Sequence, residues 1–278
     1  MNLLDYRKSI YSSIGNDGVI EKIFDVLKIE NGFFVEFGAW DGIKGSNCRN
    51  LYNKGWSGIF IEPDVTRYAD LVKNYENSEN ITCINSFVDT NDNKFDNLVS
   101  PFIHTEIDFC SIDIDGLDLE VFETFEKFLP KVICIEGGQM LEPNYPRIPA
   151  EIAKNNIQQS LQTMINSFEK KGYKLLCTYQ DCFFVKAEYF DLFKIDANTN
   201  TMYLQGLYSI HRRLPWIQHM LRLSGLRNKV VDYILQRAEY SHYGYKNRKA
   251  WAAEKEEETK KIITYLLNVA GKTNKWKY

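Results

Sequence analysis

The chain has 278 residues, of which 44% are hydrophobic and 26% charged, and this composition suits one large globular domain or one domain with an appendage. No stretch reaches the roughly 18 uninterrupted apolar residues that span a bilayer, and the first residues lack the apolar core of a signal peptide, so we expect a cytoplasmic protein. The net charge of −3 combines an acidic body with a basic tail, since residues 201–278 hold 15 Lys and Arg against 6 Asp and Glu. Such a tail indicates either a solvated helical face or an anionic partner: a phosphorylated substrate, a nucleic acid, a membrane surface or a neighbouring subunit.

The chain contains six cysteines, and no two of them have the CxxC spacing. This pattern disfavours a zinc knuckle or a thioredoxin-type redox site. Four of the cysteines lie inside apolar, strand-like runs: Cys83, Cys110, Cys134 and Cys177. We interpret the cysteines as reduced and mostly buried small hydrophobic residues.

The first third of the chain alternates helical and strand patterns. Apolar residues at helical spacing predict a helix over residues 14–27, which Asn31-Gly32 follows. The next elements that we expect are strands at 33–37, 58–61 and 81–88 and helices at 46–54 and 65–75. Short apolar runs of this kind are typical of parallel strands that are buried on both faces.

The pattern continues to about residue 198, where the composition changes. We expect strands at 107–112 and 131–135, helices at 117–128 and 149–171, and an antiparallel hairpin from 173–178 and 182–186. A loop with three prolines precedes the second of these helices. We therefore expect a domain over residues 1–198, with an N-terminal helix, and a basic helical extension over residues 199–278.

The turn after the first strand carries glycines at Gly38, Gly42 and Gly45, and the acids Glu36 and Asp41 flank it. A strand, a glycine turn, a helix and a second strand form a unit that binds nucleoside-containing cofactors. The spacing is not GxGxxG, and two carboxylates are unfavourable beside the pyrophosphate of NAD. They suit S-adenosylmethionine, which carries an ammonium group and a sulfonium.

Four segments resemble the FkbM-type methyltransferases, which belong to the class I, Rossmann-like group that uses S-adenosylmethionine. They are VEFGAWDG (35–42), WSGIFIEPD (56–64), DFCSIDIDGLDLEVF (108–122) and VICIE (132–136). The resemblance covers roughly residues 30–190 and not the tail. It implies an α/β fold with a mostly parallel seven-stranded sheet, helices on both faces and a C-terminal antiparallel hairpin.

The resemblance also implies which residues bind the cofactor. Glu36, Gly38 and Asp41 match the motif that holds the methionine part, and Glu62 matches the acid that binds the ribose hydroxyls. Asp89 matches the acid that meets the adenine amine, with Phe87 and Val88 packing on the ring, or is an ordinary loop acid. The complete set of expected cofactor-binding residues is Glu36, Gly38, Ala39, Asp41, Glu62, Pro63, Asp89 and Asp113.

The segment SIDIDGLD brings Asp113, Asp115 and Asp118 within six residues, after a strand whose carboxyl end faces the site. Two mechanisms are open. In one mechanism, Asp113 or Asp115 is the general base that removes a proton from the acceptor hydroxyl. In the other, Asp113 and Glu136 bind a divalent ion such as Mg²⁺, which lowers the hydroxyl pKa. Asp118 is interpreted as a helix N-terminal acid. His104 is a further candidate base.

We therefore expect an S-adenosylmethionine-dependent O-methyltransferase that acts on a hydroxyl of a sugar, a nucleotide-sugar or a glycan precursor. The substrate class follows from the association of the FkbM type with polysaccharide biosynthesis. The acceptor is a small molecule or glycan, phosphorylated or not, and a homo-oligomer is left open. The alternatives are a methyltransferase acting on nucleic acid or another anionic acceptor, which DIDG after the fourth strand disfavours, and a non-catalytic scaffold that binds the cofactor.

Overall fold

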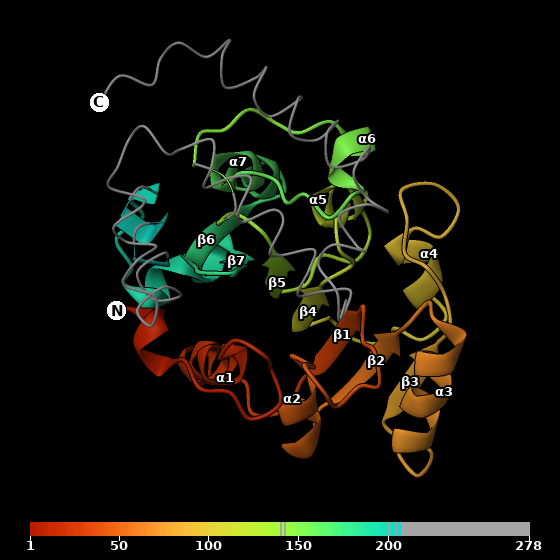
Figure 1. Cartoon of the computed structure of the whole chain (residues 1–278). Helices are drawn as coiled ribbons and strands as arrows, with labels where there is room; N and C mark the ends of the chain where they lie inside the picture. Colours follow the sequence, from red (N-terminus) through yellow and green to blue (C-terminus); the bar gives the residue numbers. More distant parts are fainter. Residues whose placement is uncertain (140, 142, 200, 204, 207–278) are drawn as a thin grey trace, which may run out of the picture.

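The computed structural model describes residues 1–139, 141, 143–199, 201–203, 205 and 206. Its centre is a seven-stranded sheet with the order β3-β2-β1-β4-β5-β7-β6 (Figure 1). The strands are β1 (Phe33–Phe37), β2 (Ser57–Ile61), β3 (Ile81–Ile84), β4 (Phe109–Ile112), β5 (Val132–Glu136), β6 (Tyr173–Thr178) and β7 (Asp181–Lys186). All seven strands lie where the sequence predicts a strand.

The direction of the strands confirms the expected fold class. Strands β1 to β5 pair in parallel, and β7 pairs antiparallel with both β5 and β6. An antiparallel β7 between β5 and β6 distinguishes this sheet from the doubly wound order 3-2-1-4-5-6 of dinucleotide-binding domains. The strand order and directions are those expected from the sequence for the Rossmann-like class I methyltransferase fold. The expected helical extension lies almost entirely outside the described residues.

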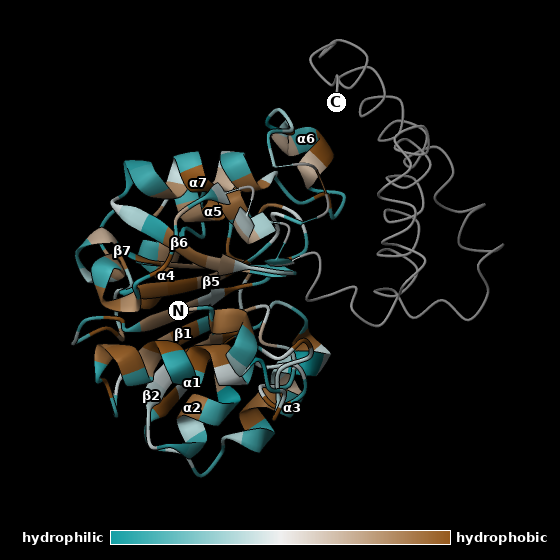
Figure 2. Cartoon of the chain, turned by 90° about the vertical axis from the view of Figure 1, so that its left-hand side faces the viewer, coloured by the Kyte–Doolittle hydropathy of each residue, from teal (hydrophilic) through white to brown (hydrophobic). Residues whose placement is uncertain are grey.

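Helices cover both faces of the sheet (Figure 2). One face carries α1 (Asn16–Leu27), α2 (Arg49–Asn53), α3 (Val65–Asn74) and the 3₁₀ helices η1 (Leu3–Tyr6) and η2 (Ala187–Phe193). The other face carries α4 (Phe95–Val99), α5 (Asp118–Glu123) and α7 (Leu161–Lys170), with α6 (Ala150–Ala153) beside them. Because side chains alternate along a strand, Phe34 packs into the first layer and Val35 and Phe37 into the second. Within the described part of the chain, no helix is long and apolar enough to cross a membrane.

The long helix expected over residues 149–171 is wrong, because the structure has α6 and α7 with a loop between them. Asn156 adopts a left-handed conformation with φ of 60°, which interrupts the helix. Ser160 then caps α7, since its hydroxyl accepts a hydrogen bond from the Thr163 backbone N–H. The backbone of Gly138 also bonds the interrupted segment, at Gln159 O. This break positions residues of the candidate site described below.

Two elements end earlier than the sequence predicts. Strand β3 stops at Ile84, because the Asn85 side chain bonds the backbone oxygens of Glu62 and Pro63 and the chain turns out of the sheet. Helix α5 stops at Glu123. The backbone N–H groups of residues 126–128 instead donate to the carboxylate of Asp96 on α4, a helix that the sequence did not predict.

Candidate active site

A cleft of about 1110 Å³ opens at the carboxyl edge of the parallel strands. Small-molecule sites typically measure roughly 300–1,000 Å³, so the cleft has room for a cofactor together with part of an acceptor. The loops after β1, β2, β3, β4 and β5 line it, together with the start of α1 and the β6–β7 turn. This is the edge at which open α/β sheets bind ligands.

Glu36, at the end of β1, anchors the loop in front of α2. Its side chain is 4% exposed, and its carboxylate accepts hydrogen bonds from Ser46 Oγ (2.6 Å), Asn47 N (2.7 Å) and Cys48 N (3.2 Å). Burial raises the pKa of Glu36 to about 7. Glu36 lines the cleft as the sequence predicts, but both of its oxygens already accept protein donors. Its visible role is to hold the wall of the cleft.

Glu62, at the carboxyl end of β2, lies beside the β1 turn. Its two oxygens accept the backbone N–H groups of Trp40 (2.7 Å) and Asp64 (2.9 Å). Desolvation raises its pKa, and the hydrogen bonds oppose this shift. Since each carboxylate oxygen has two acceptor positions, Glu62 retains capacity for two further donors from the cleft. Ala39 and Pro63 line the cleft next to it, as expected.

The loop after β3 forms the outer wall of the cleft. Asp89 lines the cleft and accepts the backbone N–H groups of Asn91 (2.7 Å) and Asn93 (3.1 Å), which folds the loop on itself. Phe87 stands at the same wall with 69% of its surface exposed. The sequence places an acid and an aromatic residue here, and the structure brings both to the cleft.

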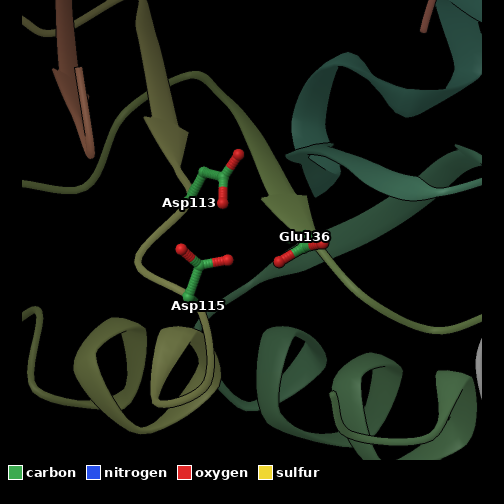
Figure 3. Close-up of side chains that lie close together, drawn as sticks. All are labelled: Asp113, Asp115 and Glu136. Atoms are coloured by element: carbon green, nitrogen blue, oxygen red, sulfur yellow. The ribbon is translucent and has the colours of Figure 1, made fainter. Parts of the chain in front are cut away.

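Three carboxylates, from Asp113, Asp115 and Glu136, converge on one point of the cleft, where each offers an oxygen within 4.8 Å of the others (Figure 3). Asp113 is solvent-exposed and lines the open cleft. Desolvation, followed by repulsion from neighbouring carboxylates, raises the pKa of both Asp113 and Glu136. A shared proton or a cation would relieve this repulsion. An all-oxygen donor set of this kind suits a hard divalent ion.

Asp118 holds the loop that carries Asp113 and Asp115. As the first residue of α5, it accepts the backbone N–H groups of Ile114 (2.8 Å) and Gly116 (2.9 Å). Burial raises its pKa to about 7, and these hydrogen bonds oppose the shift. The interpretation of Asp118 as an acid at a helix N-terminus agrees with its position.

Several polar residues of the cleft were not identified from the sequence. Asn16, on α1, donates to Asn47 Oδ1 (2.9 Å) and to Asp181 Oδ2 (2.5 Å), which connects α1, the β1 loop and β7. Gln158, in the break before α7, donates to Glu136 Oε2 at 2.5 Å. These contacts join residues that are far apart in the chain, and no local sequence pattern marks them.

Two expected site residues lie away from the cleft. His104 precedes β4, at the amino edge of the sheet, whereas Asp113 follows β4 at the carboxyl edge. The structure therefore does not bring His104 together with the other expected site residues. Asp41 does not line the cleft, and its carboxylate accepts the backbone N–H groups of Ile43 and Lys44 within the turn.

The described lining of the cleft is strongly acidic. Its carboxylates are those of Glu36, Glu62, Asp89, Asp113, Asp115, Glu136 and Asp181, against the two lysines Lys44 and Lys154. A cavity with this balance attracts cations and neutral hydrogen-bonding groups, and it disfavours anions near the three clustered carboxylates.

No protein-family model and no curated protein matches this chain. Several solved structures resemble it. TrmK of M. capricolum, in complex with the cofactor product S-adenosylhomocysteine, is 12% identical with a TM-score of 0.42, and the match covers 78% of this chain and 96% of that chain. TYW2 of M. jannaschii, in complex with AdoMet, is 16% identical with a TM-score of 0.37 over 64% of this chain and 79% of that chain.

A further structure is of a protein provisionally assigned as a sarcosine dimethylglycine methyltransferase from Galdieria sulphuraria. It is 14% identical with a TM-score of 0.41, and the match covers 58% of this chain. The chain spans 62% of the length of that protein. At these identities the likeness concerns the fold, and the reaction has to be inferred from the residues of the cleft.

Proposed function

We propose that this chain is an S-adenosylmethionine-dependent methyltransferase of the FkbM type, which transfers a methyl group to a hydroxyl of a sugar, nucleotide-sugar or glycan precursor. The observation that carries the proposal is the acidic cleft at the carboxyl edge of the sheet, with Glu62 at the end of β2. The proposed catalytic domain spans residues 1–198, and residues 199–278 form an extension to it.

The described residues fit this cofactor. Glu62 has unused acceptor positions that suit two ribose hydroxyls, and the surrounding carboxylates complement a ligand with a sulfonium and an ammonium group. Asp89 and Phe87 line the same cleft and would contact the adenine. The bound cofactor supplies an electrophilic methyl group.

The clustered carboxylates would activate the acceptor. Asp113 or Asp115 would accept the proton of the hydroxyl, because a neutral alcohol is a poor nucleophile. Gln158 and Asp118 would keep the cluster in place through their hydrogen bonds to Glu136 and to the loop after β4. Orientation of the reacting groups would contribute a large part of the rate.

The alternative use of the same cluster is a divalent ion such as Mg²⁺, held by Asp113 and Glu136 with Asp115 as a third donor. Carboxylate oxygens are the donors that such an ion prefers. A bound ion would offset the mutual repulsion of the three groups and lower the pKa of a coordinated hydroxyl.

The proposal is tested by two measurements on the full chain. Isothermal titration with S-adenosylhomocysteine measures binding, and a mass-spectrometric screen of glycan precursors measures the gain of a methyl group. A methyltransferase binds S-adenosylhomocysteine and also methylates an acceptor. A non-catalytic scaffold binds without releasing product, and absence of binding would show that the cofactor is wrong.

A further inference from the structure

Trp40 stands where a glycine-rich cofactor turn normally has its second glycine. In the G-x-G spacing that begins at Gly38, the third position is the one at which the backbone approaches the ligand most closely. Here Trp40 occupies it with φ of 54°, in the left-handed region that favours glycine. A tryptophan in this conformation is unusual enough to require a reason.

Hydrogen bonds fix the backbone of the turn on both sides of this position. The Trp40 N–H donates to Glu62 Oε2 at 2.7 Å, the Ala39 N–H donates to Ile61 O at 3.2 Å, and Gly42 N donates to Ala39 O at 2.8 Å. Trp40 cannot leave its strained conformation without breaking the bond to Glu62. The backbone of Trp40 is therefore held next to the carboxylate proposed to bind the ribose.

Packing within the protein does not explain the choice of tryptophan. The residue is 45% exposed, and it lines the cleft. The guanidinium of Arg67, on α3, lies 4.0 Å from the centre of the indole ring. Contacts within the protein therefore account for only part of the indole surface, and the exposed part is available to a ligand in the cleft.

We propose that Trp40 stacks on the adenosine part of the bound cofactor, with Arg67 supporting the indole. The inference rests on the proposed function and adds a residue that sets affinity and position for the cofactor. Stacking of an aromatic side chain on a base changes affinity by about 5- to 150-fold.

The test compares Trp40→Gly and Trp40→Phe with the unchanged chain. Titration calorimetry with S-adenosylhomocysteine and with 5′-methylthioadenosine, which lacks the amino-acid part, gives the affinities. Trp40→Gly is expected to lower the affinity for both ligands by the same factor, about tenfold or more, and Trp40→Phe is expected to lower it by less. Since glycine tolerates this φ but lacks the contact with Arg67, a thermal unfolding curve first establishes that Trp40→Gly is folded. Phe102→Ala, an exposed aromatic residue outside the cleft lining, is the control and should bind normally.

Two results would overturn the inference. Unchanged ligand affinity in a folded Trp40→Gly would show that the indole does not contact the ligand. A loss of affinity for S-adenosylhomocysteine but not for 5′-methylthioadenosine would place the contact at the amino-acid part. In each of these cases the unchanged chain still binds, so the proposed function stands; only failure of the unchanged chain to bind would end both.

Discussion

The carbonyl oxygen of Asp113 fills the space in which a side chain on Gly38 would begin, because a Cβ on Gly38 would lie 1.7 Å from it. The two residues follow the adjacent strands β1 and β4, so this contact fixes the spacing between the cofactor turn and the acidic loop. Gly38 is thus required by the packing of the two loops, in addition to any approach of a ligand.

Gly38→Ala should therefore destabilise the protein by about 3 kcal/mol, combining a φ of 74° with overpacking against Asp113. Urea unfolding measures the change. Gly172→Ala is the matched control, because the φ of Gly172 is 80° but nothing lies within 4 Å of the added Cβ. Its free energy of unfolding should therefore fall by only about 1 kcal/mol. Equal losses in the two variants would show that the Asp113 contact is unimportant.

Stability should fall as the pH rises from about 4.5 to about 7. Glu36 and Asp118 both have a pKa raised to about 7, from ordinary values of 4.5 and 3.8. In this range the folded state keeps protons that the unfolded state has released, so each group contributes a loss of up to about 1.4 kcal/mol per pH unit. Urea unfolding across the range in the unchanged chain and in Glu36→Gln tests this. The variant should show a shallower decline, and identical slopes would be incompatible with a raised pKa at Glu36.

Glu62→Ala should lower the affinity for S-adenosylhomocysteine by about 30- to 150-fold, since removing paired hydrogen bonds to the ribose costs about 2–3 kcal/mol of binding free energy. Calorimetry measures the affinity. Because Glu62 also holds the backbone of Trp40 and Asp64, circular dichroism must first establish that the variant is folded. Glu79→Gln, an exposed acid outside the cleft lining, should bind like the unchanged chain. Normal affinity in a folded Glu62→Ala would mean that the cofactor lies elsewhere.

Asp113→Asn should keep the fold and the affinity for the cofactor within a few fold, while turnover drops by about 10²- to 10⁴-fold through loss of a proton acceptor. The rate of methyl transfer under saturating substrates measures it. His104→Ala should retain full activity, because His104 lies at the opposite edge of the sheet. A fully active Asp113→Asn would exclude this carboxylate from catalysis.

Chelation separates the two uses of the carboxylate cluster. If Asp113 and Glu136 hold a divalent ion, then EDTA treatment followed by dialysis should abolish turnover, and Mg²⁺ should restore it. Calorimetric titration of the chelated protein with Mg²⁺ should also give a binding signal that Glu136→Gln lacks. Activity that survives complete chelation would assign Asp113 or Asp115 to direct proton transfer.

The alternation of strands and helices could be predicted from the sequence, because apolar runs and turn residues are local signals. The sequence also placed Glu36, Glu62, Asp113 and Glu136 at the ends of parallel strands, and strand ends of one direction meet at one edge. The same rule excludes His104, which lies before its strand, and the sequence already contained that information.

The hydrogen bonds that these side chains make depend on contacts between distant parts of the chain, which the sequence does not show. Glu36 anchors a loop because its carboxylate accepts hydrogen bonds from Ser46, Asn47 and Cys48. The position of Glu36 in its strand does not reveal the direction in which its side chain points. The hydrogen bond from Asn16 to Asp181 joins residues near opposite ends of the domain's sequence, and no local pattern encodes such a contact. The break before α7, which brings Gln158 to Glu136, depends on packing against the sheet that outweighs the helical periodicity of the segment.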